Sequence, residues 1–173
     1  NATVEVCPHH FILNDMAVLK SKTNAKMNPP LRSEEDRLAL IEGLRDGIID
    51  AISTDHAPHD LASKEKTLEE ASFGIVGVET MLPLSLTLYH DKILSLRDLL
   101  AKMTCNAAKI INYDGGIIAK GARADLTLID LDTPWEIKTD KFFSKSKNSP
   151  FDGFKVKGRA VKTVVAGKVV FEA

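Results

Sequence analysis

The stretch Ala51-Ile-Ser-Thr-Asp-His-Ala-Pro-His-Asp60 gathers an aspartate and two histidines directly after a short apolar run. That run, residues 48–52, contains β-branched residues and has the length of a buried strand. It delivers Asp55 and His56 to its carboxyl end, and Pro58 stops its continuation. Ligands bind at the carboxyl ends of strands in α/β proteins, which makes Asp55 the first candidate for a chemical role. The alternative is that Asp55 only caps a turn.

A second group of polar residues follows a second predicted strand. Residues 3–7 alternate as a strand should, and Pro8 is expected to end it. Two adjacent histidines then point in different directions, so we expect at most one of them to face a site. Glu5 and His10 could both reach a metal or a substrate, although a hydrogen-bonded structural role is the alternative.

Two further segments have backbones suited to binding a ligand. In Lys26-Met-Asn-Pro-Pro-Leu-Arg32 the double proline stiffens the chain and holds Asn28 extended, which suits substrate recognition at little cost in ordering entropy. In the second segment, Gly74 and Gly77 let the backbone approach a ligand that Phe73 can cover. The alternatives are that Asn28 satisfies local backbone groups and that the glycines form a plain turn beside a core phenylalanine.

The composition favours an ordinary globular protein. The chain has 173 residues, 44% of them hydrophobic and 27% charged, enough for one domain with or without a small appendage. A net charge of -1 gives no electrostatic case for nucleic acid or an anionic membrane surface, and no apolar run approaches the roughly 20 residues that span a bilayer. Cys7 and Cys105 form no CxxC pair, which favours thiols in a reducing compartment and a cytoplasmic location. The first residues resemble neither a start nor a signal peptide, so we expect the chain to begin within a longer protein.

The elements that must position these residues follow an α/β pattern. Ser33 and Asp36 form a partial capping box before a helix whose expected apolar stripe is Leu38, Ile41 and Leu44. This helix connects the two predicted strands, which together make a βαβ unit. Residues 61–72 are predicted to be a polar surface loop with some helix, and loops of this length are often binding loops. Helices are expected over residues 79–90 and from Ser95 onward.

The composition changes near residue 115. Separate strands are predicted over residues 124–130 and 135–137, with two or three more between 156 and 172. We therefore divide the chain into an α/β unit, residues 1–114, and a small β-unit, residues 115–173. The lysines of residues 141–153 are expected to form a solvated face.

Five motifs occur in one order along nearly the whole chain. They are Glu5-Val-Cys-Pro-His-His10, Lys26-Met-Asn-Pro-Pro-Leu-Arg32, Ser53-Thr-Asp-His-Ala-Pro-His59, Phe73-Gly-Ile-Val-Gly77 and Ser144-Lys-Ser-Lys-Asn-Ser-Pro-Phe151. Together they resemble the carboxyl-terminal part of the dihydroorotases, cyclic amidohydrolases of the amidohydrolase superfamily. The resemblance implies part of a metal-dependent (β/α)8 TIM barrel over residues 1–114, and strands of a small composite β-sandwich over residues 115–173. It also implies reversible, zinc-dependent conversion between L-dihydroorotate and N-carbamoyl-L-aspartate in pyrimidine biosynthesis.

The resemblance also assigns roles to particular residues. Asp55 resembles the aspartate that ligates zinc and acts as general base, because a bound metal activates water and polarises the amide carbonyl. Asn28 and His59 resemble residues that hold the substrate, and Phe73 and Gly74 resemble a pair whose backbone contacts the pyrimidine ring. His56 would orient Asp55, and neither it nor the histidine at position 9 is expected to be a direct metal ligand.

The chain departs from the family in length. A (β/α)8 barrel needs about 250 residues, so only the last two barrel strands and the sandwich strands can be present. The family's His-x-His pair, its bridging carboxylate and two further histidine ligands are absent from this sequence. The resemblance therefore implies two Zn²⁺ ions per complete site, other ligands upstream of this chain, and an isolated fragment that is inactive.

Three alternatives stay open at this point. Another cyclic amidohydrolase, an allantoinase or a dihydropyrimidinase, would share the fold and the metal chemistry. An inactive dihydroorotase-like subunit that supports aspartate carbamoyltransferase would keep the fold and lose metal ligands. A self-sufficient domain of unrelated function is less consistent with the open strand edges that two barrel strands would leave. The expected partner is a small-molecule substrate, with a homodimer and an association with aspartate carbamoyltransferase left open.

Overall fold

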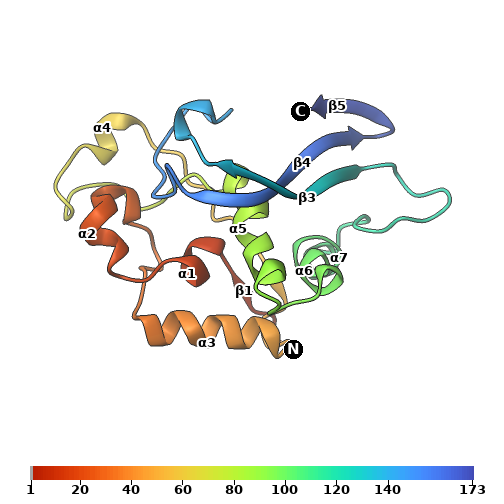
Figure 1. Cartoon of the computed structure of the whole chain (residues 1–173), viewed down its shortest axis with the longest axis horizontal. Coiled ribbons are helices and arrows are strands. Elements are labelled where there is room, and N and C mark those ends of the chain that lie inside the picture. Colours follow the sequence, from red (N-terminus) through yellow and green to blue (C-terminus); the bar gives the residue numbers. More distant parts are fainter. Residues whose placement is uncertain (1) are drawn as a thin grey trace.

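A pair of short parallel strands lies under the predicted site. In the computed structural model, which describes residues 2–173, β1 (Glu5–Val6) pairs with β2 (Ala51–Ile52). The connection between them contains α1 (Pro8–Ile12), α2 (Ala17–Ser21), the 3-10 helix η1 (Lys22–Ala25) and α3 (Glu34–Arg45). Figure 1 shows α3 running along one side of the molecule beneath α1. The βαβ unit expected from the sequence is confirmed.

The chain beyond β2 crosses the molecule and returns. A bridge between His56 and Ile75 adds a further parallel pairing next to the end of β2. The intervening residues form α4 (Leu61–Lys64) and turns, in agreement with the polar loop that was predicted there. They are followed by α5 (Val78–His90), α6 (Leu96–Met103) and α7 (Cys105–Ile110).

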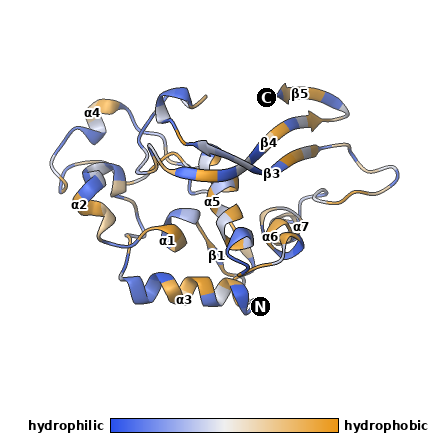
Figure 2. Ribbon diagram, in the orientation of Figure 1, coloured by the Kyte–Doolittle hydropathy of each residue, from blue (hydrophilic) through white to orange (hydrophobic). Residues whose placement is uncertain are grey.

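The start of α3 follows from its sequence, whereas its buried face differs from the expected stripe. The Ser33 hydroxyl accepts from the Asp36 backbone N–H and the Asp36 carboxylate accepts from the Ser33 backbone N–H, which completes the capping box. Leu44 is fully buried, and Ile41 packs against the same core. Leu38 is 48% exposed, and Leu40 packs there in its place. The prediction for Leu38 was therefore wrong; Figure 2 shows the mixed hydropathy of this outer helix.

The last third of the chain forms one antiparallel sheet. Its strands β3 (Leu126–Glu136), β4 (Lys155–Val165) and β5 (Lys168–Glu172) lie in that order, with the short helix η2 (Thr139–Lys141) after β3. The two strands predicted over residues 124–130 and 135–137 are one strand with a register shift between Asp130 and Pro134. The Asp130 carboxylate accepts hydrogen bonds from the backbone of Asp132 and Thr133 at this shift, so a local turn is absorbed without ending the strand.

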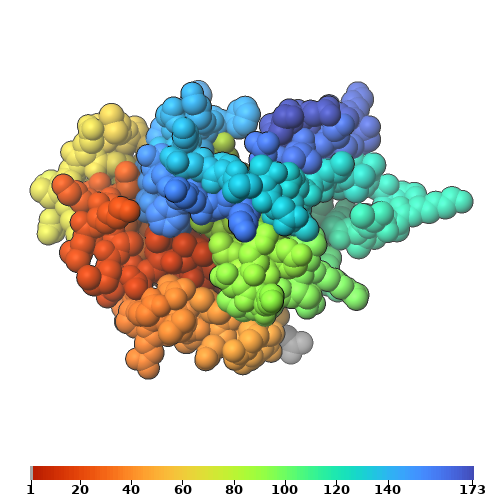
Figure 3. Space-filling view, in the orientation of Figure 1, coloured from red at the N-terminus to blue at the C-terminus, as the bar shows by residue number. Residues whose placement is uncertain are grey.

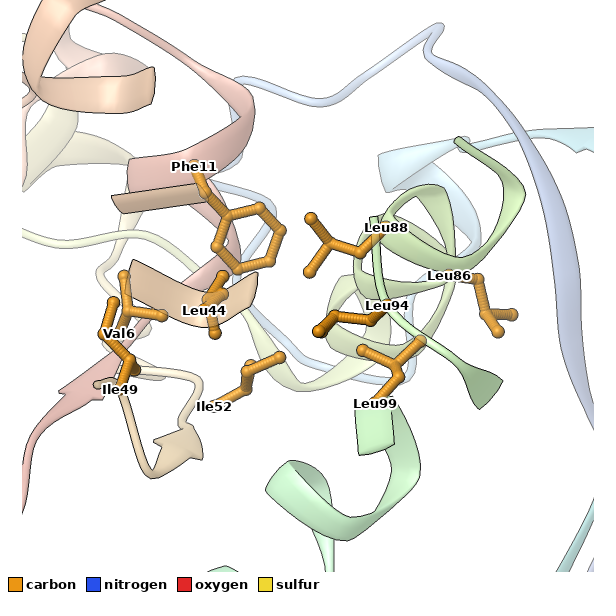
Figure 4. Packing of buried hydrophobic residues seen from close by; sticks show 9 residues of the cluster. All are labelled: Val6, Phe11, Leu44, Ile49, Ile52, Leu86, Leu88, Leu94 and Leu99. Carbon is orange, nitrogen blue, oxygen red and sulfur yellow. The ribbon is translucent and has the colours of Figure 1, made fainter. Parts of the chain in front are cut away.

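Two hydrophobic clusters hold these elements together. Figure 4 shows the first, in which side chains from α1, α3, β1 and β2 meet leucines of α5 and α6. Its buried members are Val6, Phe11, Leu44, Ile49, Ile52, Leu86, Leu88, Leu94 and Leu99. The second joins the two predicted units, since Leu84 of α5 packs in it with Ile137 and Val156.

The described residues form part of an α/β fold. Within residues 2–173 the parallel strands do not close into a barrel, and the antiparallel strands form one sheet, not two packed sheets. The division at residue 114 stays a prediction. The segment between α7 and β3 projects away from the rest of the molecule (Figure 3). None of the helices among residues 2–173 has the length and apolar character needed to cross a membrane.

Candidate functional site

Asp55 lies just beyond the end of β2 in an unusual backbone conformation. Its φ is +44°, in the left-handed region that residues other than glycine seldom occupy. The side chain lines a cavity of about 810 Å³. Aspartate tolerates this conformation in turns, so it is the place of Asp55 at the cavity wall that favours a chemical role over simple turn capping.

The cavity beside Asp55 collects residues from three of the sequence motifs. It is lined by Glu5, Val6, Cys7, His10, Asn28, Pro29, Pro30, Arg32, Leu40, Ser53, Thr54, Asp55 and His56. Two of the predicted site residues, Asp55 and Asn28, therefore share one cavity. The wall supplies two carboxylates, two imidazoles, an amide and a guanidinium, while the prolines and aliphatic side chains are apolar. Such a mixture is typical of a small-molecule site.

Three potential metal-binding side chains lie together at the start of α1. Pro8 occupies the first turn of this helix, so the proline that was expected to end a strand also begins a helix. Cys7, His9 and His10 each offer a ligand atom, and these atoms lie within 4.8 Å of one another. The His10 ring is held in place because its Nε2 donates to the backbone carbonyl of Pro29 at 2.9 Å.

His9 is the most unusual of these three residues. It is 2% exposed, and its Nε2 is buried without a hydrogen-bond partner. Burial, with a smaller contribution from His10, lowers its pKa to about 3, so the ring is neutral at pH 7. A buried polar atom without a partner costs free energy unless something absent from the chain binds it. The sequence did not predict His9 as a metal ligand. Its buried, unpartnered Nε2 now makes it a candidate.

Cys7 connects this histidine pair to the end of β2. Its Sγ lies 3.3 Å from the Ser53 hydroxyl oxygen. Burial raises the pKa of the Cys7 thiol; the Ser53 hydrogen bond opposes this shift, and the Asp55 and Glu5 carboxylates add to it. The thiol is therefore protonated at neutral pH, and the negative charges around it favour a cation in this cavity.

The other predicted site residues form a second group. His59 Nε2 lies 2.7 Å from the Phe73 carbonyl oxygen, to which it donates. Gly74 has φ +122°, and a Cβ there would come within 2.4 Å of the Ala57 Cβ and 3.3 Å of His59 Nε2. The Phe73 ring is 55% exposed, with the Lys26 ammonium 4.3 Å from its centre. Only glycine at position 74 permits this close approach.

The two groups line different cavities. His59 lines a cavity of about 460 Å³ that does not include Asp55 or Asn28. The segment from Lys26 to Asn28 links them, because the Gly74 backbone N–H donates to the Lys26 carbonyl at 2.9 Å. His56, expected to orient Asp55, instead accepts at Nδ1 from the backbone N–H groups of Gly77 and Val78, at 3.1 and 3.4 Å. It joins the end of β2 to the start of α5.

Comparison with known proteins identifies similar sequences along nearly the whole chain. Residues 4–170 match the family model described as the Amidohydrolase family. The chain is 61% identical to a dihydroorotase of Wolbachia sp. subsp. Drosophila simulans (strain wRi), over 99% of this chain and 39% of that protein. It is 52% identical to a dihydroorotase of Geobacter metallireducens, over 98% of this chain and 40% of that protein. The chain thus spans about two fifths of the length of these relatives.

Solved structures show the same architecture. An L-hydantoinase (dihydropyrimidinase) from Arthrobacter aurescens has a TM-score of 0.92 and 35% identity, with 98% of this chain and 39% of that chain covered. A dihydropyrimidinase from Brevibacillus agri also has a TM-score of 0.92, at 22% identity over 99% of this chain and 40% of that one, which shows the fold alone. The α/β part and the antiparallel sheet described above therefore have their counterparts within larger enzymes.

Proposed function

The chain belongs to the amidohydrolase family. We propose that the full-length protein, of which this chain is a part, is a dihydroorotase. The reaction would be the reversible conversion between L-dihydroorotate and N-carbamoyl-L-aspartate in pyrimidine biosynthesis. The choice of substrate rests on sequence identity. The chain is 61% and 52% identical to proteins named dihydroorotase, but 35% identical to the L-hydantoinase. We also propose that this chain forms the carboxyl-terminal portion of the full-length protein.

Amidohydrolases are generally metal-dependent, and the residues of this chain fit a metal. His9 presents a buried, neutral and unpartnered Nε2, which is the form of imidazole that binds metals. Asp55 supplies a carboxylate in the cavity that Cys7 and His10 also line. Nitrogen and oxygen ligands of this kind suit Zn²⁺. We assign His9 and Asp55 as the ligands from this chain, with two Zn²⁺ per complete site and the remaining ligands elsewhere in the protein.

The metal would supply Lewis acidity for the amide carbonyl and a lowered pKa for the attacking water. The Asp55 carboxylate would accept a proton from the attacking water and return it to the departing ring nitrogen, and ring closure would reverse these transfers. Asn28 and His59 hold the substrate, and the backbone at Phe73 and Gly74 contacts the pyrimidine ring. The rigid close packing of His59 against Gly74 supports this assignment, because preorganised groups lose little entropy on binding.

A hydantoinase or dihydropyrimidinase is the second candidate, favoured by the structural likeness to the Arthrobacter enzyme. It would use the same metal chemistry on a different cyclic amide, as would an allantoinase. An inactive partner of aspartate carbamoyltransferase is the third, and the cavity-lining Asp55 and the unpartnered Nε2 of His9 favour a working site over it. A cytoplasmic location, a homodimer and an association with aspartate carbamoyltransferase belong to the proposal as well.

Assays of the full-length protein on L-dihydroorotate, allantoin, dihydrouracil and hydantoin test the assignment. We expect turnover of L-dihydroorotate, and ring closure when N-carbamoyl-L-aspartate is supplied at acidic to neutral pH. Turnover of only the other cyclic amides would replace dihydroorotase by the second candidate. A well-folded protein that binds metal and turns over none of them would favour the inactive partner.

A further inference from the structure

A buried lysine lies beside the second group of site residues. Lys64, in α4, is only 4% exposed although its neighbours in the polar loop are mostly exposed. Its ammonium donates to three backbone carbonyls, those of Ser72 at 2.9 Å, Gly74 at 3.0 Å and Lys26 at 3.4 Å. The N–H donors of this one side chain thus connect α4 to two other segments, the turn over residues 72–74 and the segment at Lys26.

A buried amide completes these connections. Asn148 is 6% exposed, and its Nδ2 donates to the carbonyls of Ala57 at 3.0 Å and Gly74 at 3.1 Å. Its Oδ1 accepts from the His59 backbone N–H at 3.2 Å. Both the Nδ2 donor group and the Oδ1 acceptor of this side chain are therefore in use.

Lys64 and Asn148 meet at one atom, because both donate to the Gly74 carbonyl. Through this shared acceptor they tie together the Phe73-Gly74 turn, the loop that carries His59 and the segment that leads to Asn28. We call the two side chains the Lys64–Asn148 node. It holds the backbone of two proposed substrate-contacting residues directly, Gly74 at its carbonyl and His59 at its N–H, and it contacts the Lys26 carbonyl two residues before Asn28.

The chemistry of the Lys64–Asn148 node fits a role in positioning the neighbouring backbone segments better than a role in stabilising the fold. Burial, with the charge of Lys26 adding, lowers the pKa of Lys64 to about 8, which shows that the buried charge is disfavoured. An apolar side chain of similar volume would fill the same space without this cost. Only an ammonium can direct three donors to three carbonyls from a single point.

We infer that Lys64 and Asn148 are positioning residues for substrate binding, which fix His59, Phe73 and Gly74 relative to the segment that carries Asn28. This inference rests on the proposed function, since the residues they fix are its proposed substrate contacts. Neither Lys64 nor Asn148 has a hydrogen bond to Asp55 or His9, so we expect the node to act mainly on the binding of substrate.

The test compares Lys64→Met with Lys102→Met in the full-length enzyme. Lys102 is also buried, at 7% exposure, and its ammonium donates to the Ile49 carbonyl, so the control makes the same chemical change away from the site. We expect Lys64→Met to raise KM for L-dihydroorotate about tenfold with kcat changed less than about threefold, as the loss of several modest hydrogen bonds predicts. Lys102→Met should leave KM unchanged. An unchanged KM in a folded Lys64→Met protein, or equal effects in both variants, would overturn the inference.

Asn148→Asp provides a second, independent variant. Aspartate keeps an acceptor for the His59 N–H and removes both donors. Because both side chains act on Gly74, the KM effects of Lys64→Met and Asn148→Asp should be clearly less than additive in the double variant. Full additivity would mean that the two residues do not act as one node.

Amide hydrogen exchange separates a failure of this inference from a failure of the proposed function. The Gly74 N–H donates to the Lys26 carbonyl, and the Val76 N–H donates to the Asn148 carbonyl. Both amides should exchange at least about tenfold faster in Lys64→Met and not in Lys102→Met. If the wild type turned over a different cyclic amide, this result together with a raised KM for that substrate would still support the node. Unchanged exchange would overturn it whatever the substrate.

Discussion

At the scale of single residues, Asp55 carries the chemistry that we propose. Asparagine is one of the few residues that tolerates a positive φ, so Asp55→Asn should preserve the backbone at φ +44° while it removes the charge. We expect kcat of the full-length protein at saturating Zn²⁺ to fall about 10³-fold, with the fold retained by circular dichroism. Asp46→Asn, at an exposed residue after α3, is the matched control and should keep full activity. Activity of Asp55→Asn within tenfold of wild type would exclude Asp55 as the base.

Residue identity predicted some site residues and not others, for physical reasons. Asp55 and Asn28 line one cavity, and His59 meets Phe73 and Gly74, so residues singled out by motif and backbone type do come together. The role that we propose for His9 was missed, because the sequence does not say which of two adjacent histidines is buried. Pro8 at the start of α1 was the available signal, since it indicates a helix that turns one ring inward.

Lys64 could not be found from the sequence at all. It stands in a polar run with Lys66, Glu65 and Glu69, and no periodicity separates it from these residues. Its burial depends on carbonyls from residues up to 38 positions away, which only the folded chain brings together. Long-range polar contacts of this kind carry no local pattern.

At the scale of elements, helix boundaries followed from capping residues more closely than strand boundaries did from alternation. Ser33 and Ser95 precede helices as predicted, because each hydroxyl satisfies an N–H three residues later. The double prediction for β3 was wrong because the Asp130 side chain forms a turn inside the strand. Leu38 shows a related limit, since the orientation of a helix depends on what packs against it.

The contact between the antiparallel sheet and α5 gives a prediction at this scale. A Cβ at Gly158 in β4 would lie 2.5 Å from Leu86 Cδ1 and 3.0 Å from two backbone carbonyls, at φ +85°. Gly158→Ala should therefore lower the free energy of unfolding of the full-length protein by about 2–4 kcal/mol, from backbone strain and overpacking together.

Gly167→Ala is the matched control for this variant. Gly167 has φ +78°, and a Cβ there would meet nothing within 4 Å, so this substitution measures the backbone strain alone. Its cost should be about 1–2 kcal/mol, and urea denaturation measures both variants. Equal losses would mean that β4 and α5 can separate to admit the extra methyl group.

At the scale of the whole molecule, the sequence motifs were sufficient to predict the family. They did not predict a complete fold, because a closed barrel and a sandwich need more strands. Motifs spread from Glu5 to Phe151 predicted an amidohydrolase, and the family match over residues 4–170 confirms it. A barrel and a sandwich need strands that this chain does not contain, since it spans about two fifths of its relatives. The proposed metal site is also incomplete within this chain, because His9 and Asp55 are too few ligands for a zinc ion on their own.

Metal removal from the full-length protein is the prediction that belongs to this scale. A metal that binds only the native state stabilises it by about 4 kcal/mol at a thousandfold excess over Kd, so chelation should abolish turnover and lower Tm by several degrees. Zn²⁺ should restore both. His9→Gln removes the imidazole that fits the metal and nearly preserves the buried volume; we expect it to shrink the Tm shift on chelation, whereas Asp46→Asn should leave that shift intact. Full turnover by protein with less than about 0.1 metal ion per chain would contradict a metal-dependent site, because water without a bound metal has a pKa far above neutrality.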